Sequence, residues 1–159
     1  MKKVLLLVLT TMLMACSGGV TSNKPVEFLE IPIEGSVYSF GSKLEGKGYV
    51  SDGEDAYYPT LFYNGIYLNK KTVIKVWYDK DTKEVDWVQV NFDDDLPNAN
   101  AIIAEYNQKY GKCELNTDDS GCNEFTWKVN NGYIRLTTYT SPIMDIIYSS
   151  NVANDYHNK

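Results

Sequence analysis

The stretch TVIKVWYDKDTKEVDWVQVNF, residues 72–92, constrains the fold more than any other part of the chain. Apolar and polar residues alternate on both sides of a polar turn at residues 79–84, which is the pattern of a β-hairpin. Placing Trp77 opposite Trp87 also pairs apolar residues with one another, namely Val76 with Val88, Ile74 with Val90 and Thr72 with Phe92. A slip of one residue would mix the two faces. We therefore expect one apolar face, with both tryptophans on the other.

A second hairpin is predicted over residues 124–139, EFTWKVNNGYIRLTTY, around the dipeptide Asn131-Gly132. Type I′ turns favour this dipeptide, and such a turn would pair Val129 with Ile134 and Trp127 with Leu136. Trp127 would then be a core residue, with Tyr133 and Arg135 on the opposite face. Residues 62–68 predict a strand or a hairpin interrupted at Asn64-Gly65, and residues 143–150 predict a last strand.

The first predicted helix covers residues 36–47. Ser36 can cap its start and Gly48 can close its end. Its apolar face is formed by Val37, Phe40, Gly41 and Leu44. Gly41 and Gly46 each cost about 1 kcal/mol relative to alanine, so this helix depends on tertiary packing.

The second predicted helix has the clearest periodicity, with a stripe formed by Ala99, Ile102, Ile103, Tyr106 and Tyr110. Asp94 or Asp95 can cap it, Pro97 suits its first turn and Gly111 suits its end.

These elements predict an α+β domain over residues 26–150. Two tandem α-β-β-β(-β) units would form an antiparallel sheet with both helices packed on one face. The helix-free face would carry the candidate interaction residues Trp77, Trp87, Lys75, Gln89, Tyr133 and Arg135. Aromatic groups are enriched at protein interfaces and can stack on sugars. The alternative is a cross-strand pair that only stabilises the sheet, by about 0.2–1 kcal/mol.

Residues 1–15 predict a signal peptide, with Lys2 and Lys3 before an apolar core at residues 4–14. This core is too short to span a membrane. The sequence Leu13-Met14-Ala15-Cys16 resembles a bacterial lipobox, which implies lipidation of Cys16 and cleavage before it. The alternative is an ordinary secretory signal with an incidental cysteine.

Residues 16–25 are small and polar and predict a flexible tether, and residues 151–159 predict a loose tail. Ser17 is not the aspartate that retains lipoproteins in the inner membrane, and no acidic residue precedes Glu27. We therefore expect a lipid-anchored outer-membrane protein that faces the periplasm, with surface exposure as the alternative.

Removal of Lys2 and Lys3 lowers the formal net charge from −6 to −8. This acidity argues against a nucleic-acid partner, because phosphate binding depends on clustered Lys and Arg.

Cys113 and Cys122 predict a disulfide in an oxidising periplasm. A loop of about ten residues would add roughly 2.5–3 kcal/mol. A metal site is disfavoured, because the only histidine, His157, lies in the predicted tail.

The chain has no G-x-S-x-G motif, phosphate-binding loop or EF-hand loop. Helix capping accounts for Asp93-Asp94-Asp95 more simply than calcium binding does. No cofactor or metal is expected.

A non-enzymatic binding or scaffolding module with a protein or glycan partner is the leading prediction. A small hydrolase of glycan or peptidoglycan, with two carboxylates as acid and base, is the alternative. A purely structural lipoprotein is the third.

Three stretches together resemble a family of small uncharacterised lipoproteins of Gram-negative gut bacteria. They are FLEIPIEGSVYSFGSKLEGKGY (28–49), YNQKYGKCE (106–114) and FTWKVNNGYIRLTTY with IIYSSN (125–151). The chain departs from that pattern at Glu30, where glycine is usual, and at Gly41 and Gly46. The resemblance implies anchoring and fold but no activity. The tandem layout is also similar to the β-lactamase inhibitor protein fold, in which a sheet face grips a partner.

Overall fold

The computed structural model describes residues 22–92, 95–139 and 144–150. The predicted signal peptide, Cys16 and the predicted tail therefore lie outside the described residues. No helix within the described ranges is long and apolar enough to cross a membrane.

The alternating stretch forms the predicted hairpin of β6 (Lys70–Tyr78) and β7 (Val85–Phe92). The predicted register is confirmed, with Trp77 opposite Trp87 and Val76 opposite Val88. Ile74, Val76, Val88 and Val90 are all fully buried. The alternation therefore separates a core face from a second face.

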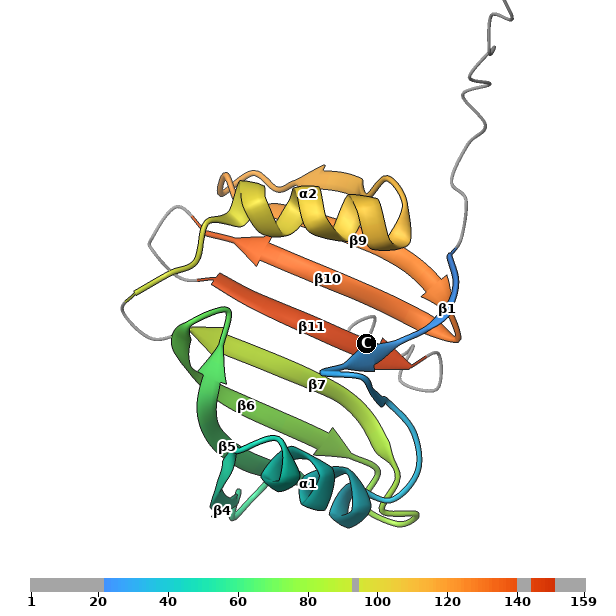
Figure 1. The fold of residues 1–159 in the computed structure, drawn as a ribbon, viewed down its shortest axis with the longest axis vertical. Coiled ribbons are helices and arrows are strands. Elements are labelled where there is room, and N and C mark those ends of the chain that lie inside the picture. The colour runs from blue at the N-terminus through green and yellow to red at the C-terminus, as the bar shows by residue number, and fades with distance from the viewer. Residues whose placement is uncertain (1–21, 93–94, 140–143, 151–159) are drawn as a thin grey trace, which may run out of the picture.

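The described residues form an α+β domain with one large, mostly antiparallel sheet and two helices on one side of it (Figure 1). The other strands of this sheet are β1 (Ser22–Pro25), β4 (Val50–Glu54), β5 (Thr60–Tyr67), β8 (Glu114–Thr117), β9 (Asn123–Asn130), β10 (Gly132–Thr138) and β11 (Met144–Ser150). The helices are α1 (Val37–Gly46) and α2 (Ala99–Tyr110). The order along the sheet is β1-β9-β10-β11-β7-β6-β5-β4, and β8 pairs with β9. The two predicted units, α1 to β7 and α2 to β11, thus join through the antiparallel pair β7 and β11.

Helix α1 (Val37–Gly46) buries the four predicted residues Val37, Phe40, Gly41 and Leu44. Helix α2 (Ala99–Tyr110) buries Ile102, Tyr106 and Tyr110 of its predicted stripe. Its cap is neither Asp94 nor Asp95. The Asn98 side chain instead accepts hydrogen bonds from the backbone N–H groups of Asn100 and Ala101, which the first turn leaves without helical partners.

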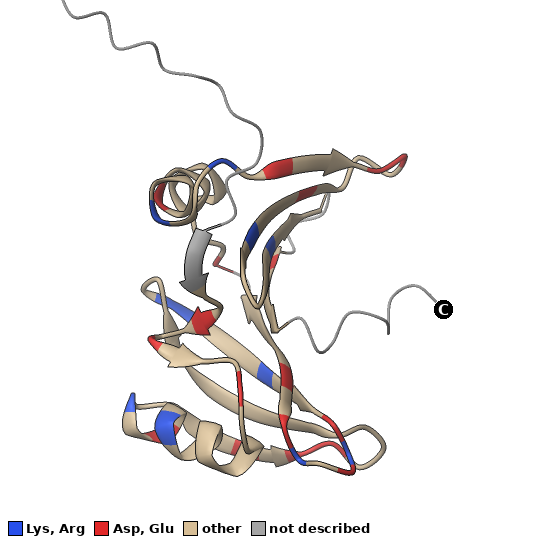
Figure 2. Ribbon diagram, turned by 90° about the vertical axis from the view of Figure 1, so that its right-hand side faces the viewer, with Lys and Arg blue, Asp and Glu red and all other residues tan. Residues whose placement is uncertain are grey.

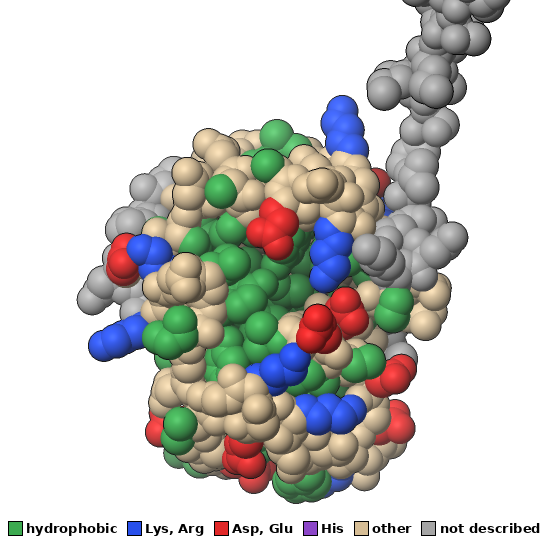
Figure 3. Space-filling model, in the orientation of Figure 1, with side chains coloured by type: hydrophobic (Ala, Val, Ile, Leu, Met, Phe, Trp, Pro, Cys, Tyr) green, Lys and Arg blue, Asp and Glu red, His purple; other side chains and the backbone are tan. Residues whose placement is uncertain are grey.

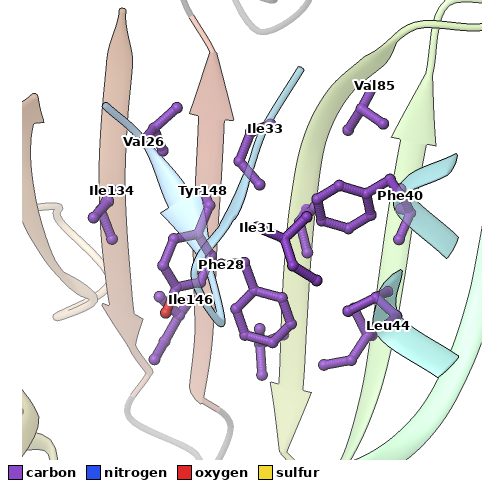
Figure 4. Close-up of a cluster of buried hydrophobic side chains, with 14 of the residues drawn as sticks. Val26, Phe28, Ile31, Ile33, Phe40, Leu44, Val85, Ile134, Ile146 and Tyr148 are labelled. Atoms are coloured by element: carbon purple, nitrogen blue, oxygen red, sulfur yellow. The ribbon is translucent and has the colours of Figure 1, made fainter. Parts of the chain in front are cut away.

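The start of the domain lies earlier than predicted. Residues 22–25, assigned to the tether, form β1 (Ser22–Pro25), which pairs in parallel with β9. The short strands β2 (Glu27–Phe28) and β3 (Ile31–Pro32) follow. The apolar side chains in and beside these two strands are buried, namely Val26, Phe28, Ile31 and Ile33. Phe28 lies against Tyr148 of β11, so this hairpin fills the core between the two units (Figure 4).

The predicted register of the second hairpin is wrong by two residues. Ile134 lies opposite Trp127, and Gly132 lies opposite Val129. A two-residue slip keeps every side chain on its predicted face, so Trp127 is still a core residue, with 1% exposure. Gly132 belongs to β10 rather than to the turn, because a Cβ there would overlap the backbone of Ser149 on β11.

The Asn64-Gly65 dipeptide likewise lies inside β5 and makes no turn. A side chain at Gly65 would overlap the ring of Tyr49. The chain reverses at Leu68 and Asn69, both of which have positive φ.

Candidate interaction face

The six predicted interaction residues all lie on the helix-free face, and each is half-buried. They form two rows across adjacent strands. Tyr133, Ser149, Trp87 and Trp77 follow one another across β10, β11, β7 and β6, and Arg135, Ile147, Gln89 and Lys75 form the next row. A third row places Thr137, Asp145 and Asn91 side by side. We call these three rows the helix-free face. Figure 2 shows both helices on the opposite side of the sheet, which curves away from them.

Trp77 and Trp87 stack on one another, with ring centroids 4.7 Å apart and an interplanar angle of 11°. Tyr58 lies against Trp77 at 6.2 Å. The Asp55 carboxylate fixes this loop by accepting hydrogen bonds from the N–H groups of Tyr57 and Tyr58, and these bonds hold the pKa of Asp55 below its usual value. The aromatic row therefore extends to the exposed Tyr58.

The central strand β11 is buried on both sides, unlike its neighbours. Asp145 faces the helix-free side but is only 6% exposed. Its Oδ2 accepts a hydrogen bond of 2.8 Å from Gln89 Nε2, whereas its Oδ1 has no partner. The burial of Asp145 could not be predicted from the sequence, because a strand residue on a helix-free face is expected to be open to solvent.

Further buried polar atoms on this face lack partners, namely Asn91 Oδ1, Arg135 Nε and Trp77 Nε1. Arg135 Nη1 lies 3.7 Å from Glu124 Oε1 on β9. Unsatisfied buried polar groups cost about 1–3 kcal/mol each and are rare in folded proteins. Their concentration on one face is a feature that a bound partner would account for.

Charges around Asp145 also affect two neighbouring side chains. Burial raises the pKa of Tyr139, and the carboxylate of Asp145 raises it further. Burial raises the pKa of the Cys122 thiol, and the nearby carboxylates, first Asp118, act in the same direction. Negative charge therefore outweighs the nearby Arg135 at this end of the face.

The predicted disulfide between Cys113 and Cys122 is not formed, since both cysteines are free. The pairing of Glu114 with Thr126 and of Thr117 with Asn123 places the two cysteines at opposite ends of the β8–β9 ladder. Their separation is about five residues along the strand direction, or roughly 16 Å at 3.3 Å per residue. A disulfide requires Cα atoms within about 7 Å.

The helix side carries a different feature, an apolar hollow between α1 and α2 (Figure 3). Also in the core on the helix side of the sheet, the hydroxyl groups of Tyr67, Tyr106 and Tyr148 bond to one another at 2.5–3.0 Å. Burial raises the pKa of Tyr106 and of Tyr148 well above its usual value. Because these hydroxyl groups satisfy one another, the cluster is a structural link between α2, β5 and β11.

A cavity of about 490 Å³ lies between the N-terminal segment and the β6–β7 turn. Its lining includes the four acidic residues Glu34, Asp79, Glu84 and Asp86. Burial raises the pKa of Asp86, and the charges of Asp79 and Glu84 raise it further. Asp79 itself accepts hydrogen bonds from the N–H groups of Asp81 and Thr82, so its carboxylate closes the turn.

No group of three or more His, Cys, Asp or Glu side chains that could hold a metal ion occurs within the described part of the chain. No family model, curated protein or solved structure matches the sequence. The resemblance to small envelope lipoproteins therefore remains a prediction.

Proposed function

We propose that this protein is a lipid-anchored protein of the bacterial cell envelope that binds a partner protein through its helix-free face. The observation that carries the proposal is the Trp77–Trp87 stack in a half-buried aromatic row beside unpaired polar atoms. Buried aromatic anchors surrounded by polar groups are typical of the energetically dominant part of protein interfaces. The proposed activity is non-enzymatic.

A protein partner is favoured over a glycan by the geometry of the aromatic groups. Sugar rings stack on open aromatic faces, but here each indole covers one face of the other. Tyr58 also lies against Trp77. The unpaired donors and acceptors suit the mixed polar and apolar surface of a folded or extended polypeptide.

The helix-free face is also favoured over the apolar hollow on the helix side. On the helix side, the hydroxyl groups of Tyr67, Tyr106 and Tyr148 already have partners. On the helix-free face, four polar atoms of Trp77, Asn91, Arg135 and Asp145 have none. A partner can therefore supply missing hydrogen bonds on the helix-free face but would add few on the helix side.

Lipidation of Cys16 would hold this face close to the membrane. Strand β1 starts at Ser22, six residues after Cys16. Six extended residues span at most about 20 Å. A thioether-linked lipid would therefore restrict the domain to partners at or near the membrane surface.

Site-specific photocrosslinking in intact cells tests the proposal with the full-length protein. A photoreactive residue replaces Lys75 or Tyr133 on the helix-free face, and a control replaces the exposed Glu105 on α2. We expect one discrete adduct from the two face positions and none from Glu105, with at least a fivefold lower yield when Trp87→Ala is added. Equal adducts from both sides of the sheet, or a yield that Trp87→Ala leaves unchanged, would contradict the proposal.

A small hydrolase of glycan or peptidoglycan is the second candidate, favoured by the acidic cavity. A carboxyl group with a raised pKa is suited to act as a general acid, and Asp86 has this property. The substitution Asp86→Asn should abolish release of soluble fragments from purified peptidoglycan if this function is real. Absence of release by the unaltered protein would exclude it for that substrate.

A further inference from the structure

The carboxyl group of Asp145 is buried and takes part in no ion pair among the described residues. The side chain is 6% exposed, and among the described residues the only hydrogen bond to it comes from the neutral amide of Gln89. A carboxylate in such a position is costly unless a cation approaches it.

The neighbouring Arg135 does not supply that cation. Its Nη1 is directed to Glu124 Oε1 at 3.7 Å, and its Nε has no partner. Arg135 is also one row away from Asp145, because it lies opposite Ile147 on β11. The Asp145 carboxylate therefore keeps an open acceptor position.

A second open acceptor lies directly beside the first. Asn91 on β7 is the register partner of Asp145 on β11, and its Oδ1 is buried without a hydrogen bond. Directly opposed residues have Cα atoms about 4.5–5.5 Å apart. Asn91 is half-buried on the helix-free side, but both Oδ1 atoms are themselves buried, so a partner side chain would reach them only after neighbouring side chains shift.

We propose that Asp145 and Asn91 form a recognition site for one cationic side chain, an arginine or lysine of the partner protein. Asp145 Oδ1 and Asn91 Oδ1 would each accept a hydrogen bond from the guanidinium or ammonium group, and Gln89 would hold the carboxylate in place. This inference rests on the proposed function, since it names the chemistry that the helix-free face recognises.

The net charge of the whole chain favours a basic partner, whereas the face itself also carries the cations Lys75 and Arg135. The whole chain carries a formal net charge of −6, so long-range attraction favours a positively charged surface. Trp87 lies four residues from Asn91 along β7, or about 13 Å at 3.3 Å per residue. A partner segment could therefore place an apolar group against Trp87 and its basic group at Asp145. A metal ion is a poorer match, because the described residues offer no set of three or more acidic, His or Cys ligands.

The test uses two matched peptides and the purified full-length protein in detergent. The probes are acetyl-Gly-Arg-Gly-amide and the same peptide with citrulline, which keeps the shape of arginine but is neutral. The side-chain amide signals of Asn91 and Gln89 in nitrogen-15 NMR spectra report directly on the site. We expect saturable shifts of both signals with the arginine peptide, and at least tenfold weaker binding of the citrulline peptide.

The substitution Asp145→Asn should weaken arginine binding at least tenfold, because it removes the charge but retains the oxygen that Gln89 bonds. Glu114→Gln is the matched control, since Glu114 is exposed, lies near the β8 edge and already pairs with Lys128. It removes the same charge and should change the affinity less than twofold. Circular dichroism checks that both variants fold.

Equal binding of both peptides, or unchanged affinity after Asp145→Asn, would overturn the inference. Shifts of the same signals with calcium chloride and not with the arginine peptide would also overturn it, in favour of a cation site. Adducts that persist from Lys75 and Tyr133 in the crosslinking experiment would, in either case, leave the proposed function standing. Loss of those adducts with arginine binding intact would contradict the proposed function instead.

Discussion

Trp77 and Trp87 lie opposite one another on β6 and β7, with their rings nearly parallel and their centroids 4.7 Å apart. Such a pair contributes about 0.5–1.5 kcal/mol beyond its burial. We predict a coupling free energy in this range from a double-mutant cycle of Trp77→Ala and Trp87→Ala, measured by urea unfolding followed by circular dichroism. Additive effects of the two substitutions would show that the rings do not interact.

Trp127 provides the contrast, because it lies in the core. It is 1% exposed, and its Nε1 donates a hydrogen bond of 3.0 Å to Asn107 Oδ1 on α2. Trp127→Ala should lower the free energy of unfolding by about 3–5 kcal/mol, mainly through the cavity it creates, because Asn107 Oδ1 still accepts a hydrogen bond from the N–H of Cys113. A cost similar to that of Trp87→Ala would contradict the assignment of the two faces.

The buried faces of the β6–β7 hairpin and of both helices could be predicted, because each depends on the spacing of apolar residues within one segment. Alternation fixes which side of a strand is buried, and a one-residue slip is costly. The two-residue slip in the second hairpin could not be detected this way. It keeps the faces unchanged, and the glycine at position 132 instead allows a close approach to Ser149, which lies 17 residues further along the chain.

The burial of Phe28 and Asp145 could not be predicted, because it arises from segments distant in sequence. Phe28 belongs to a strand of two residues, which is too short to show a period, and it is buried by Tyr49, Tyr67 and Tyr148. Asp145 is buried because β11 becomes the centre of the sheet where the two units meet. The predicted disulfide between the two cysteines was wrong for a similar reason, since their spacing in the sequence does not reveal that a strand ladder separates them.

Gly41 and Gly46 are expected to respond in opposite ways to alanine, although both lie in α1. A Cβ at Gly46 meets no atom within 4 Å, so Gly46→Ala should stabilise the protein by about 0.5–1 kcal/mol. A Cβ at Gly41 would overlap the hydroxyl group of the buried Tyr63, so Gly41→Ala should destabilise it by about 1–3 kcal/mol. Tyr63→Phe should restore part of that loss, as measured by urea unfolding. Equal effects of the two alanines would contradict the close approach of α1 to β5.

Glu30 has a left-handed backbone conformation, with φ of 63°, at the turn between β2 and β3. Glycine adopts this conformation without steric cost, whereas residues with a Cβ do not. Glu30→Ala and Glu30→Gly both remove the exposed ion pair with Lys47, so the comparison isolates the backbone. We expect Glu30→Gly to unfold at a higher urea concentration than Glu30→Ala. The reverse order would show that this turn is not left-handed in solution.

The buried tyrosine cluster predicts a loss of stability at alkaline pH. Burial raises the pKa of Tyr106 and Tyr148 well above its usual value, and it raises that of Tyr49 to about 12. The folded chain therefore retains phenol protons that the unfolded chain releases near pH 10. The corresponding stability is fully present below about pH 10. This stability is lost as the pH rises above that value, by about 1.4 kcal/mol per pH unit for each such group.

The urea midpoint of unfolding should therefore fall across this pH range, and phenolate absorbance should rise as the protein unfolds. Tyr148→Phe should reduce the slope because one of these groups is removed, whereas Tyr57→Phe, at a side chain that is 91% exposed, should leave it unchanged. Phenolate absorbance that rises for all tyrosines before unfolding begins would show that the cluster is open to solvent.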